Sequence, residues 1–335
     1  MSDEVLEAGK LPPALLAEVL VTGRPVPPEL LLPPTVGEDA GVVAVQGGAL
    51  IAASDPVTLT GQDVGAHAVL VNANDIAVMG ARPRWFTATV LLPPGTTDNE
   101  VRALYRRMHE ALAALDAVLV GGHVEITDAV RRTVVVGHMM GLREDGGFAR
   151  TAALEPGHVV LQIGPAPVEG AAVLAAEAGA QLEGRVAPAM LAAGAGALTD
   201  PGISVVDAAL RATALGATAM HDPTEGGLSA GLYEMAETAG IRLVVARDAV
   251  LWYEPGRAMA KALGIDPWGL LASGALLAAF PAGTAEAALA TLTAEGFSCA
   301  PIARAEAGHG VGFQSGGDVP RFARDEMIRV VSADG

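Results

Sequence analysis

The chain has 335 residues and a formal net charge of −17, and 51% of its residues are hydrophobic. This length suggests two domains of ordinary size, each able to bury a core. The acidic balance argues against a nucleic-acid surface, which requires a basic stripe. We see no apolar run of membrane-spanning length and no signal peptide, so we expect a cytoplasmic protein. The single cysteine, Cys299, excludes an intrachain disulfide and a thiolate zinc site, and we expect a buried, inert thiol.

Residues 1–36 are rich in proline and form an N-terminal extension that cannot join the interior of a sheet. Residues 37–150 follow as a first domain in which strands and helices alternate. Its strands are expected at residues 42–45, 49–53, 85–92, 118–120 and 132–142, with Ser54-Asp55-Pro56 ending the second one. Its helices are expected at residues 64–79, closed by Gly80, and at 99–115, capped by Thr97 or Asp98. This alternation indicates an α/β domain.

The pattern changes near residue 150, and residues 151–335 indicate a second, α+β domain. Its strands are expected at residues 158–163, 241–246 and 275–280. Its helices are expected at residues 170–178, 228–238 and 285–295, and the stretch 181–219 is expected to be helical with breaks.

Acidic residues recur at the ends of strands or the starts of helices, beside glycine or proline. They are Glu38-Asp39, Asp55, Asp75 and Asp222, and His123 and Glu125 form a further polar cluster after Gly121-Gly122. Each carboxylate alone is more often a turn-former or a helix cap than a ligand. Their repetition favours a site for a divalent cation and nucleotide phosphates, because clustered carboxylates repel one another and need a cation.

Two segments carry most of this prediction. In the helix before Gly80, Asn74 and Asp75 stand among apolar residues, which suggests that Asp75 faces a site; a polar helix turn with a glycine cap is the alternative. In the segment from residue 220 to 228, Pro223 suits the first turn of a helix, and Gly226-Gly227 permit close approach of a ligand to the backbone. The N–H groups at that helix start predict an anion site beside Asp222, and a simple Asp N-cap is the alternative.

His221, beside Asp222, is the histidine that stands out as a candidate for the site, with a structural role as the alternative. The other histidines show no spacing typical of a metal site; they include His67, His109, His138, His158 and His309. The sequence contains no Walker A motif, nucleophile elbow, zinc signature or dinucleotide fingerprint.

Taken together, these segments resemble the AIR-synthetase superfamily of ATP-dependent enzymes. Its members include aminoimidazole ribonucleotide synthetase, the hydrogenase-maturation protein HypE, thiamine-monophosphate kinase and selenophosphate synthetase, and the HypE-like, AIR synthase-related group is most similar. The segments that carry the resemblance are Gly9-Lys10-Leu11-Pro12, Gly37-Glu38-Asp39-Ala40, Ser54-Asp55-Pro56, residues 71–83, Gly121-Gly122-His123-Val124-Glu125 and residues 222–228. Their order and spacing cover nearly the whole chain.

The resemblance implies a PurM-like two-domain fold of the α+β class, in which the N-terminal α/β domain pairs with a second copy to form a dimeric barrel. It implies ATP and Mg²⁺ in a cleft at the dimer interface. The metal ligands would be Asp39, Asp55, Asp75 and Asp222. The nucleotide contacts would be Lys10, Asn74, Asp75, Gly121, Gly122, Thr224, Gly226 and Gly227. The catalytic residues would be Asp75, Asp222, His123 and Glu125.

The implied chemistry is phosphoryl transfer from ATP, which phosphorylates or activates a small molecule or the carbonyl group of a protein partner. The chain differs from its relatives in three places. It ends at Val330-Val331-Ser332-Ala333-Asp334-Gly335, without the cysteine tail of HypE; His123 stands where several members carry Asp, and Glu225 where many carry Arg. These differences leave open a catalytically inactive, nucleotide-binding regulatory or scaffold protein, whereas the retained acids favour the enzyme.

Overall fold

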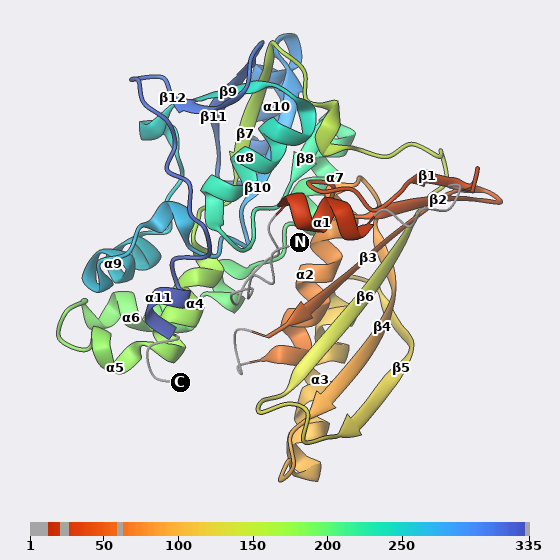
Figure 1. Cartoon of the computed structure of the whole chain (residues 1–335), viewed down its shortest axis with the longest axis vertical. Coiled ribbons are helices and arrows are strands. Elements are labelled where there is room, and N and C mark those ends of the chain that lie inside the picture. Colours follow the sequence, from red (N-terminus) through yellow and green to blue (C-terminus); the bar gives the residue numbers. More distant parts are fainter. Residues whose placement is uncertain (1–12, 21–26, 59–62, 332–335) are drawn as a thin grey trace.

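The computed structural model describes residues 13–20, 27–58 and 63–331, and it contains two sheets, one in each half of the chain (Figure 1). The first sheet has the spatial order β1-β2-β3-β6-β4-β5, and β4–β5 is its one parallel pair in the part of the chain that the structure describes. Its strands are β1 (Leu30–Leu32), β2 (Gly41–Val45), β3 (Gly48–Val57), β4 (Pro83–Leu92), β5 (Val118–Ile126) and β6 (Val134–Arg143). Helix α2 (Val64–Val78) packs on this sheet, and α3 (Asp98–Ala114) packs against α2.

The second sheet has the order β12-β9-β11-β7-β10-β8, and its only parallel pair among the described residues is β9–β12. Its strands are β7 (His158–Ile163), β8 (Ala219–His221), β9 (Arg242–Val245), β10 (Leu276–Pro281), β11 (Cys299–Glu306) and β12 (Gly310–Phe313). The helices are α1 (Pro13–Leu20), α4 (Val168–Glu177), α5 (Gly179–Leu182), α6 (Pro188–Ala195), α7 (Val206–Ala214), α8 (Gly227–Ala239), α9 (Glu254–Leu263), α10 (Ala282–Ala294) and α11 (Ile328–Val331).

One hydrophobic core crosses the boundary between the two halves. It joins Ile51 and Phe86 of the first sheet and Ile76 of α2 to Leu161 and Phe280 of the second sheet. A separate core lies under α8, on the other face of the second sheet. The shared core fixes the two halves against each other, so side chains from both can form one site.

Local signals in the sequence predicted several elements to within about two residues. Helix α2 follows its expected range, and α3 begins with a capping box in which Thr97 and Glu100 bond reciprocally. The predicted end of β3 at Ser54-Asp55-Pro56 is wrong. The strand continues to Val57, because Asp55 pairs with Gly137 and Pro56 with Val136 across β6.

Other elements were predicted incompletely. Strand β5 continues through its glycines to Ile126, and β1, β11, β12 and α9 were not predicted. The sulfur of Cys299 is half-buried, 3.3 Å from the hydroxyl of Thr293, and is therefore less enclosed than expected.

No single described helix is both long and apolar enough to cross a membrane. The bent pair Pro188–Ala195 and Leu198–Ala214 meets the criteria of length and composition only when the two helices are taken together.

Candidate active site

A predicted acid, Asp39, and a second acid, Glu234, meet around the buried His221. Oδ1 of Asp39, in the turn before β2, lies 2.7 Å from Nδ1 of His221 at the end of β8. Nε2 of the same ring lies 2.9 Å from a carboxylate oxygen of Glu234 on α8. Burial acts to lower the pKa of His221, but the two carboxylates raise it well above its usual value. His221 is therefore held as an imidazolium between two acids, and it orients Asp39.

Glu38 fastens the turn that carries Asp39. One Glu38 oxygen accepts a hydrogen bond from the N–H of Thr151 at 3.0 Å, and the other lies 3.4 Å from the guanidinium of Arg150. The Thr151 hydroxyl lies 3.2 Å from the carbonyl oxygen of Met220 and 3.4 Å from Oδ2 of Asp39. Burial raises the pKa of Glu38. Glu38 and Thr151 thus hold the Asp39 turn against the strand that ends in His221.

Asp55 lies on β3, and its backbone is fixed by Asn72 of α2. Oδ1 of Asn72 accepts a hydrogen bond from the N–H of Asp55 at 2.8 Å, and Nδ2 donates to the carbonyl of Asp55 at 3.1 Å. This close approach requires Gly137, because a Cβ there would lie 2.4 Å from Asn72 Nδ2 and 2.8 Å from the ring of Phe86. The Asp55 residue itself is exposed, so its carboxylate can face a ligand.

Asp222 is only 3% exposed, and neither of its carboxylate oxygens has a hydrogen-bond partner among the described residues. Its pKa is raised well above the usual value, first by burial and then by the charge of Asp39, with a further contribution from Asp55. A buried carboxylate whose pKa is raised by the charges of two others is an arrangement that a divalent cation relieves. We call Asp39, Asp55 and Asp222 the acidic centre.

The donor set of the acidic centre fits Mg²⁺ that is bound together with phosphate. In the described part of the chain, no group of three or more His, Cys, Asp or Glu side chains is arranged to hold a metal ion alone. Mg²⁺ does not require such a group, because it usually binds one or two carboxylates and completes its shell with phosphate and water oxygens. Such an ion would be coordinated by the two oxygens of Asp222, which have no hydrogen-bond partner among the described residues.

Asn74 and Asp75, adjacent on α2, have different surroundings. Nδ2 of Asn74 donates to the carbonyl of Ile203 and Oδ1 accepts from the N–H of Val205, both at 2.9 Å. Asn74 therefore links α2 to the second half, and its contact with a nucleotide stays a prediction. Asp75 is 8% exposed and follows Asn72 by three residues, which places it on the same side of α2, one turn further on. Its role as a ligand stays a prediction.

The predicted anion site at the start of α8 is partly occupied by the protein itself. The N–H of Gly226 donates to Oδ2 of Asp325 at 2.9 Å, and the N–H of Gly227 donates to the carbonyl of Thr224 at 3.0 Å. A Cβ at Gly227 would lie 2.5 Å from the carbonyl oxygen of Trp268. Gly227 therefore permits close packing within the protein, and a phosphate would have to displace Asp325 to reach the N–H of Gly226.

The polar pair on β5 lies apart from the acidic centre. Nε2 of His123 is 3.2 Å from a carboxylate oxygen of Glu125, and both side chains are exposed. Strands β6 and β4 separate β5 from Asp55, which corresponds to about 14 Å at the usual strand spacing. Gly122 serves strand pairing, because a Cβ there would lie 2.1 Å from the carbonyl oxygen of Ala88, and its neighbour Gly121 is exposed on the same edge strand. Within one copy, β5 therefore does not join the centre.

Lys10, predicted as a nucleotide contact, lies outside the described residues. Asn72, Thr151 and Glu234 were not predicted as site residues from the sequence. The only sequence signal for Asn72 was an amide placed among apolar residues two positions before Asn74. Thr151 and Glu234 carried no such signal, because their partners are distant in the sequence.

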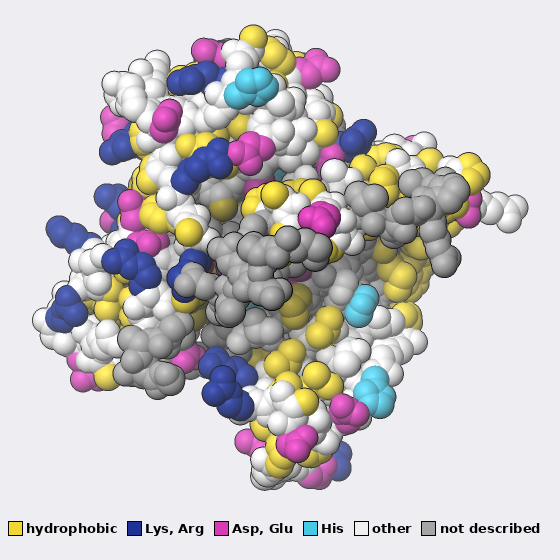
Figure 2. Space-filling view, in the orientation of Figure 1, with side chains coloured by type: hydrophobic (Ala, Val, Ile, Leu, Met, Phe, Trp, Pro, Cys, Tyr) yellow, Lys and Arg dark blue, Asp and Glu magenta, His cyan; other side chains and the backbone are white. Residues whose placement is uncertain are grey.

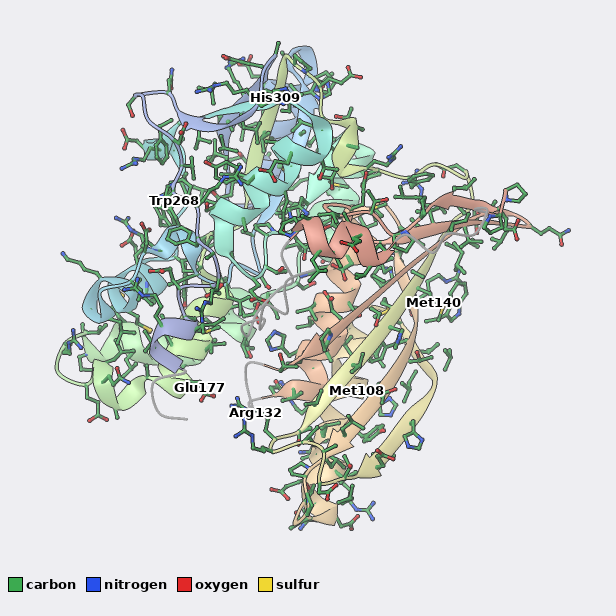
Figure 3. The ribbon with its side chains drawn as sticks, in the orientation of Figure 1. Met108, Arg132, Met140, Glu177, Trp268 and His309 are labelled. Atoms are coloured by element: carbon green, nitrogen blue, oxygen red, sulfur yellow. The ribbon has the colours of Figure 1, made fainter. Side chains whose placement is uncertain are left out.

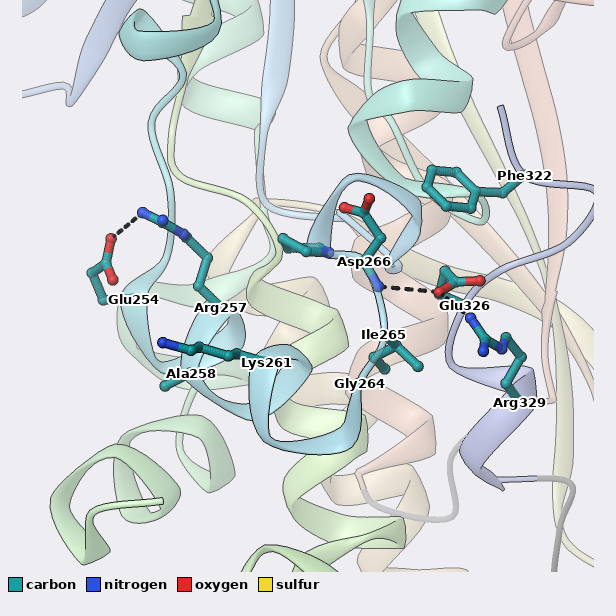
Figure 4. Close-up of a pocket in the computed structure, with 11 residues that line it drawn as sticks. Glu254, Arg257, Ala258, Lys261, Gly264, Ile265, Asp266, Phe322, Glu326 and Arg329 are labelled. Atoms are coloured by element: carbon teal, nitrogen blue, oxygen red, sulfur yellow. Dashed lines mark hydrogen bonds and ion pairs between the residues drawn. The ribbon is translucent and has the colours of Figure 1, made fainter. Parts of the chain in front are cut away.

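A wide groove of about 850 Å³ lies elsewhere, between α9, the loop after it and the segment that leads into α11 (Figure 4). Arg257, Lys261 and Arg329 line it, and Lys and Arg side chains gather over this part of the surface (Figure 2). Arg257 is paired with Glu254 at 2.9 Å and Arg329 with Glu326 at 2.8 Å. None of the predicted site residues lines this groove.

Comparison with known proteins assigns the fold and the family. Residues 37–142 match the model of the AIR synthase related protein N-terminal domain, and residues 155–316 match that of the C-terminal domain. The chain belongs to the AIR synthase related family. The resemblance inferred from the sequence is thus confirmed, as is the PurM-like two-domain fold.

Two curated relatives carry different activities. The chain is 31% identical over 258 residues to carbamoyl dehydratase HypE of Rhodobacter capsulatus, covering 76% of this chain and 73% of that protein. It is also 31% identical over 285 residues to thiamine-monophosphate kinase of Mycobacterium tuberculosis, covering 78% of each chain. A crystal structure of hydrogenase maturation protein HypE in complex with ATP superposes with a TM-score of 0.70, at 22% identity, covering 87% of this chain and 90% of that one.

Proposed function

We propose that this protein is an ATP- and Mg²⁺-dependent enzyme that phosphorylates or activates a carbonyl group of a small molecule or of a protein. The observation that carries the proposal is the buried carboxylate of Asp222, which has no hydrogen-bond partner among the described residues and faces the charges of Asp39 and Asp55. The relatives support the proposal, because one is named a dehydratase, another a kinase, and a structural neighbour was crystallised with ATP.

In this proposal, Asp39, Asp55, Asp75 and Asp222 hold Mg²⁺. The ion would supply neutralisation of phosphate charge and alignment of the transferred group. The protein contributes a prearranged set of carboxylates. His221 orients Asp39 through its 2.7 Å ion pair, and Asn72 fixes the backbone that carries Asp55. Prearrangement of this kind lowers the barrier because little reorganisation is left for the reaction itself.

We also propose a homodimer formed through β5. This edge strand exposes Val118, Val120, Val124 and Ile126, each between 45 and 56% accessible. A long apolar edge strand is a ready template for pairing with another chain, and a second copy would cover it. Such pairing would bring His123 and Glu125 of one copy against the surface of the other.

The second candidate is a nucleotide-binding regulatory or scaffold protein without turnover. The hydrogen bond from Gly226 to Asp325 favours it, since the N–H group expected to bind phosphate is already used. Calorimetric titration with ATP, with and without Mg²⁺, followed by measurement of phosphate release, separates the two. Binding without hydrolysis in the presence of a broad set of substrates would favour the scaffold.

Asp75→Asn tests the ligand assignment directly. We expect it to weaken Mg-ATP binding about tenfold or more, because a charge-assisted contact contributes about 1.5–3 kcal/mol. The folded state should persist, as judged by circular dichroism. An unchanged affinity in the folded variant would remove Asp75 from the site.

A further inference from the structure

A second buried polar cluster lies where α2 meets α4. Nε2 of His67 is 2.6 Å from Oε1 of Glu169, and the two residues are 2% and 5% exposed. The pair links the two halves of the chain. Three buried atoms in this region have no hydrogen-bond partner among the described residues: Nδ1 of His67, Oε2 of Glu169 and Oγ of Ser273. We call His67, Glu169 and Ser273 the seam cluster.

The seam cluster adjoins the loop that follows Asp222. The N–H of Glu169 donates to the carbonyl of Ser273 at 3.4 Å, and the N–H of Ala272 donates to the carbonyl of Thr224 at 3.2 Å. In the same loop, the N–H of Gly226 donates to Asp325, and the charge of Glu169 acts to raise the pKa of Asp325. A ligand in the seam would therefore lie beside the proposed phosphate-binding segment.

We propose that the seam cluster binds a primary ammonium group. An ammonium carries three N–H donors and no acceptor, so it requires several acceptors close together. Oε2 of Glu169, Oγ of Ser273 and the carboxylate of Asp325 are acceptors in this region. His67 balances the charge of one carboxylate, whereas two are present. A neutral amide or hydroxyl would leave the second charge uncompensated, and burial makes that costly.

The pKa of Asp325 is raised, as expected where buried carboxylates lie close to one another. Its pKa is raised to about 7, first by burial and then also by the charges of Glu225 and Glu169, against the effect of the N–H groups of Met327 and Gly226. A bound ammonium would favour the ionised form of Asp325. The proposal itself stands on the unsatisfied oxygens of Glu169 and Ser273.

Space for the rest of the ligand exists beside His67. A cavity of about 240 Å³ is lined by His67, by apolar side chains that include Leu70, Leu198 and Ile203, and by the charged side chains of Asp63, Arg107 and Glu110. The favoured ligand is therefore an amine on a short aliphatic body. The binding of an ammonium in the seam does not depend on the proposed function. The further statement that this amine belongs to the phosphoryl acceptor does rest on the proposed function.

The test uses three probes with the same carbon chain: n-butylammonium, butyramide and 1-butanol. Saturation-transfer NMR on the full chain without nucleotide should detect n-butylammonium and not the neutral probes. Glu169→Gln should weaken ammonium binding about tenfold or more, because it removes a charge-assisted hydrogen bond. Glu177→Gln, on the exposed end of the same helix (Figure 3), is the matched control and should leave binding within about twofold.

Ser273→Ala provides a second variant in case Glu169→Gln does not fold. It should also weaken the binding of n-butylammonium. Equal or tighter binding of butyramide or 1-butanol overturns the assignment of a cation. Failure of all three probes at tens of millimolar means that the seam holds water only, which also overturns the proposal. Mg-ATP is titrated into the same samples, so a failure of nucleotide binding is seen separately from a failure of the seam.

Discussion

Replacement of Asp222 by asparagine should stabilise the ligand-free protein while it removes Mg-dependent nucleotide binding. Asparagine keeps the shape of the side chain and loses its charge. In the ligand-free state that charge is unfavourable, because the carboxylate is 3% exposed, has no hydrogen-bond partner among the described residues and lies near Asp39 and Asp55. Functional sites commonly keep such unfavourable groups for the sake of a ligand.

The size of the effect follows from the cost of an unsatisfied buried group, about 1–3 kcal/mol and more when the group is charged. We expect Asp222→Asn to raise the free energy of unfolding at pH 8 by about 1–3 kcal/mol, and each kcal/mol raises Tm by about 2–4 °C. The difference depends on pH. Because the folded-state pKa of Asp222 is raised, the wild type loses stability as pH rises above the unfolded value of 3.8 towards the folded one. The difference should therefore be small near pH 4 and largest at alkaline pH.

Thermal unfolding from pH 4 to pH 9, with and without Mg-ATP, measures both effects. Saturating Mg-ATP should raise the Tm of the wild type and have much less effect on the variant, since a ligand stabilises only a fold that binds it. If Asp222→Asn is less stable than the wild type at pH 8, or gains the same stabilisation from Mg-ATP, then Asp222 is not held for a cation and the reasoning fails.

Three further predictions concern the surroundings of the site. His221→Gln should destabilise the protein more at pH 6 than at pH 9, as measured by denaturant titration. A histidine with a raised pKa adds stability to the folded state, and this stability is lost as the pH rises through the folded-state pKa. Equal losses of stability at both pH values would contradict a protonated His221. Gly137→Ala should lower the free energy of unfolding by about 1–3 kcal/mol in the same assay and weaken the binding of Mg-ATP, because its Cβ would displace Asn72. A variant with unchanged stability and binding would refute that contact. Val120→Lys should shift sedimentation from dimer to monomer, while Val19→Lys on α1 should not; a monomeric wild type would refute the β5 interface.

The elements predicted well from the sequence are those whose signals are local. Thr97 and Glu100 stand three residues apart and cap α3, and Gly80 with its positive φ follows the last turn of α2. Strand β3 was cut short because Asp55-Pro56 resembles a strand end. Its continuation depends on β6, which begins near residue 134, and no local pattern reports that pairing.

The sequence predicted the acidic residues of the site, but it did not predict the side chains that pair with them. Asp39 and His221 are distant in the chain, as are His67 and Glu169, so only the fold brings each pair together. Asn74 illustrates the same difference between a local signal and a distant partner. An amide among apolar residues indicates a specific hydrogen-bonding task, but the sequence does not say whether its partner is a ligand or the backbone at Ile203.

The distribution of satisfied and unsatisfied polar groups separates scaffold from site in this protein. Asn72, Asn74 and Glu38 are buried or partly buried, and each has its hydrogen bonds completed by backbone groups. Asp222 is equally enclosed and has none from the described residues. These three neighbours are satisfied within the fold, and a buried carboxylate without a donor adds nothing to the stability of the ligand-free protein. In the proposed function a bound cation supplies that gain, so we expect the chemistry at the acidic centre and not at the groove beside α9.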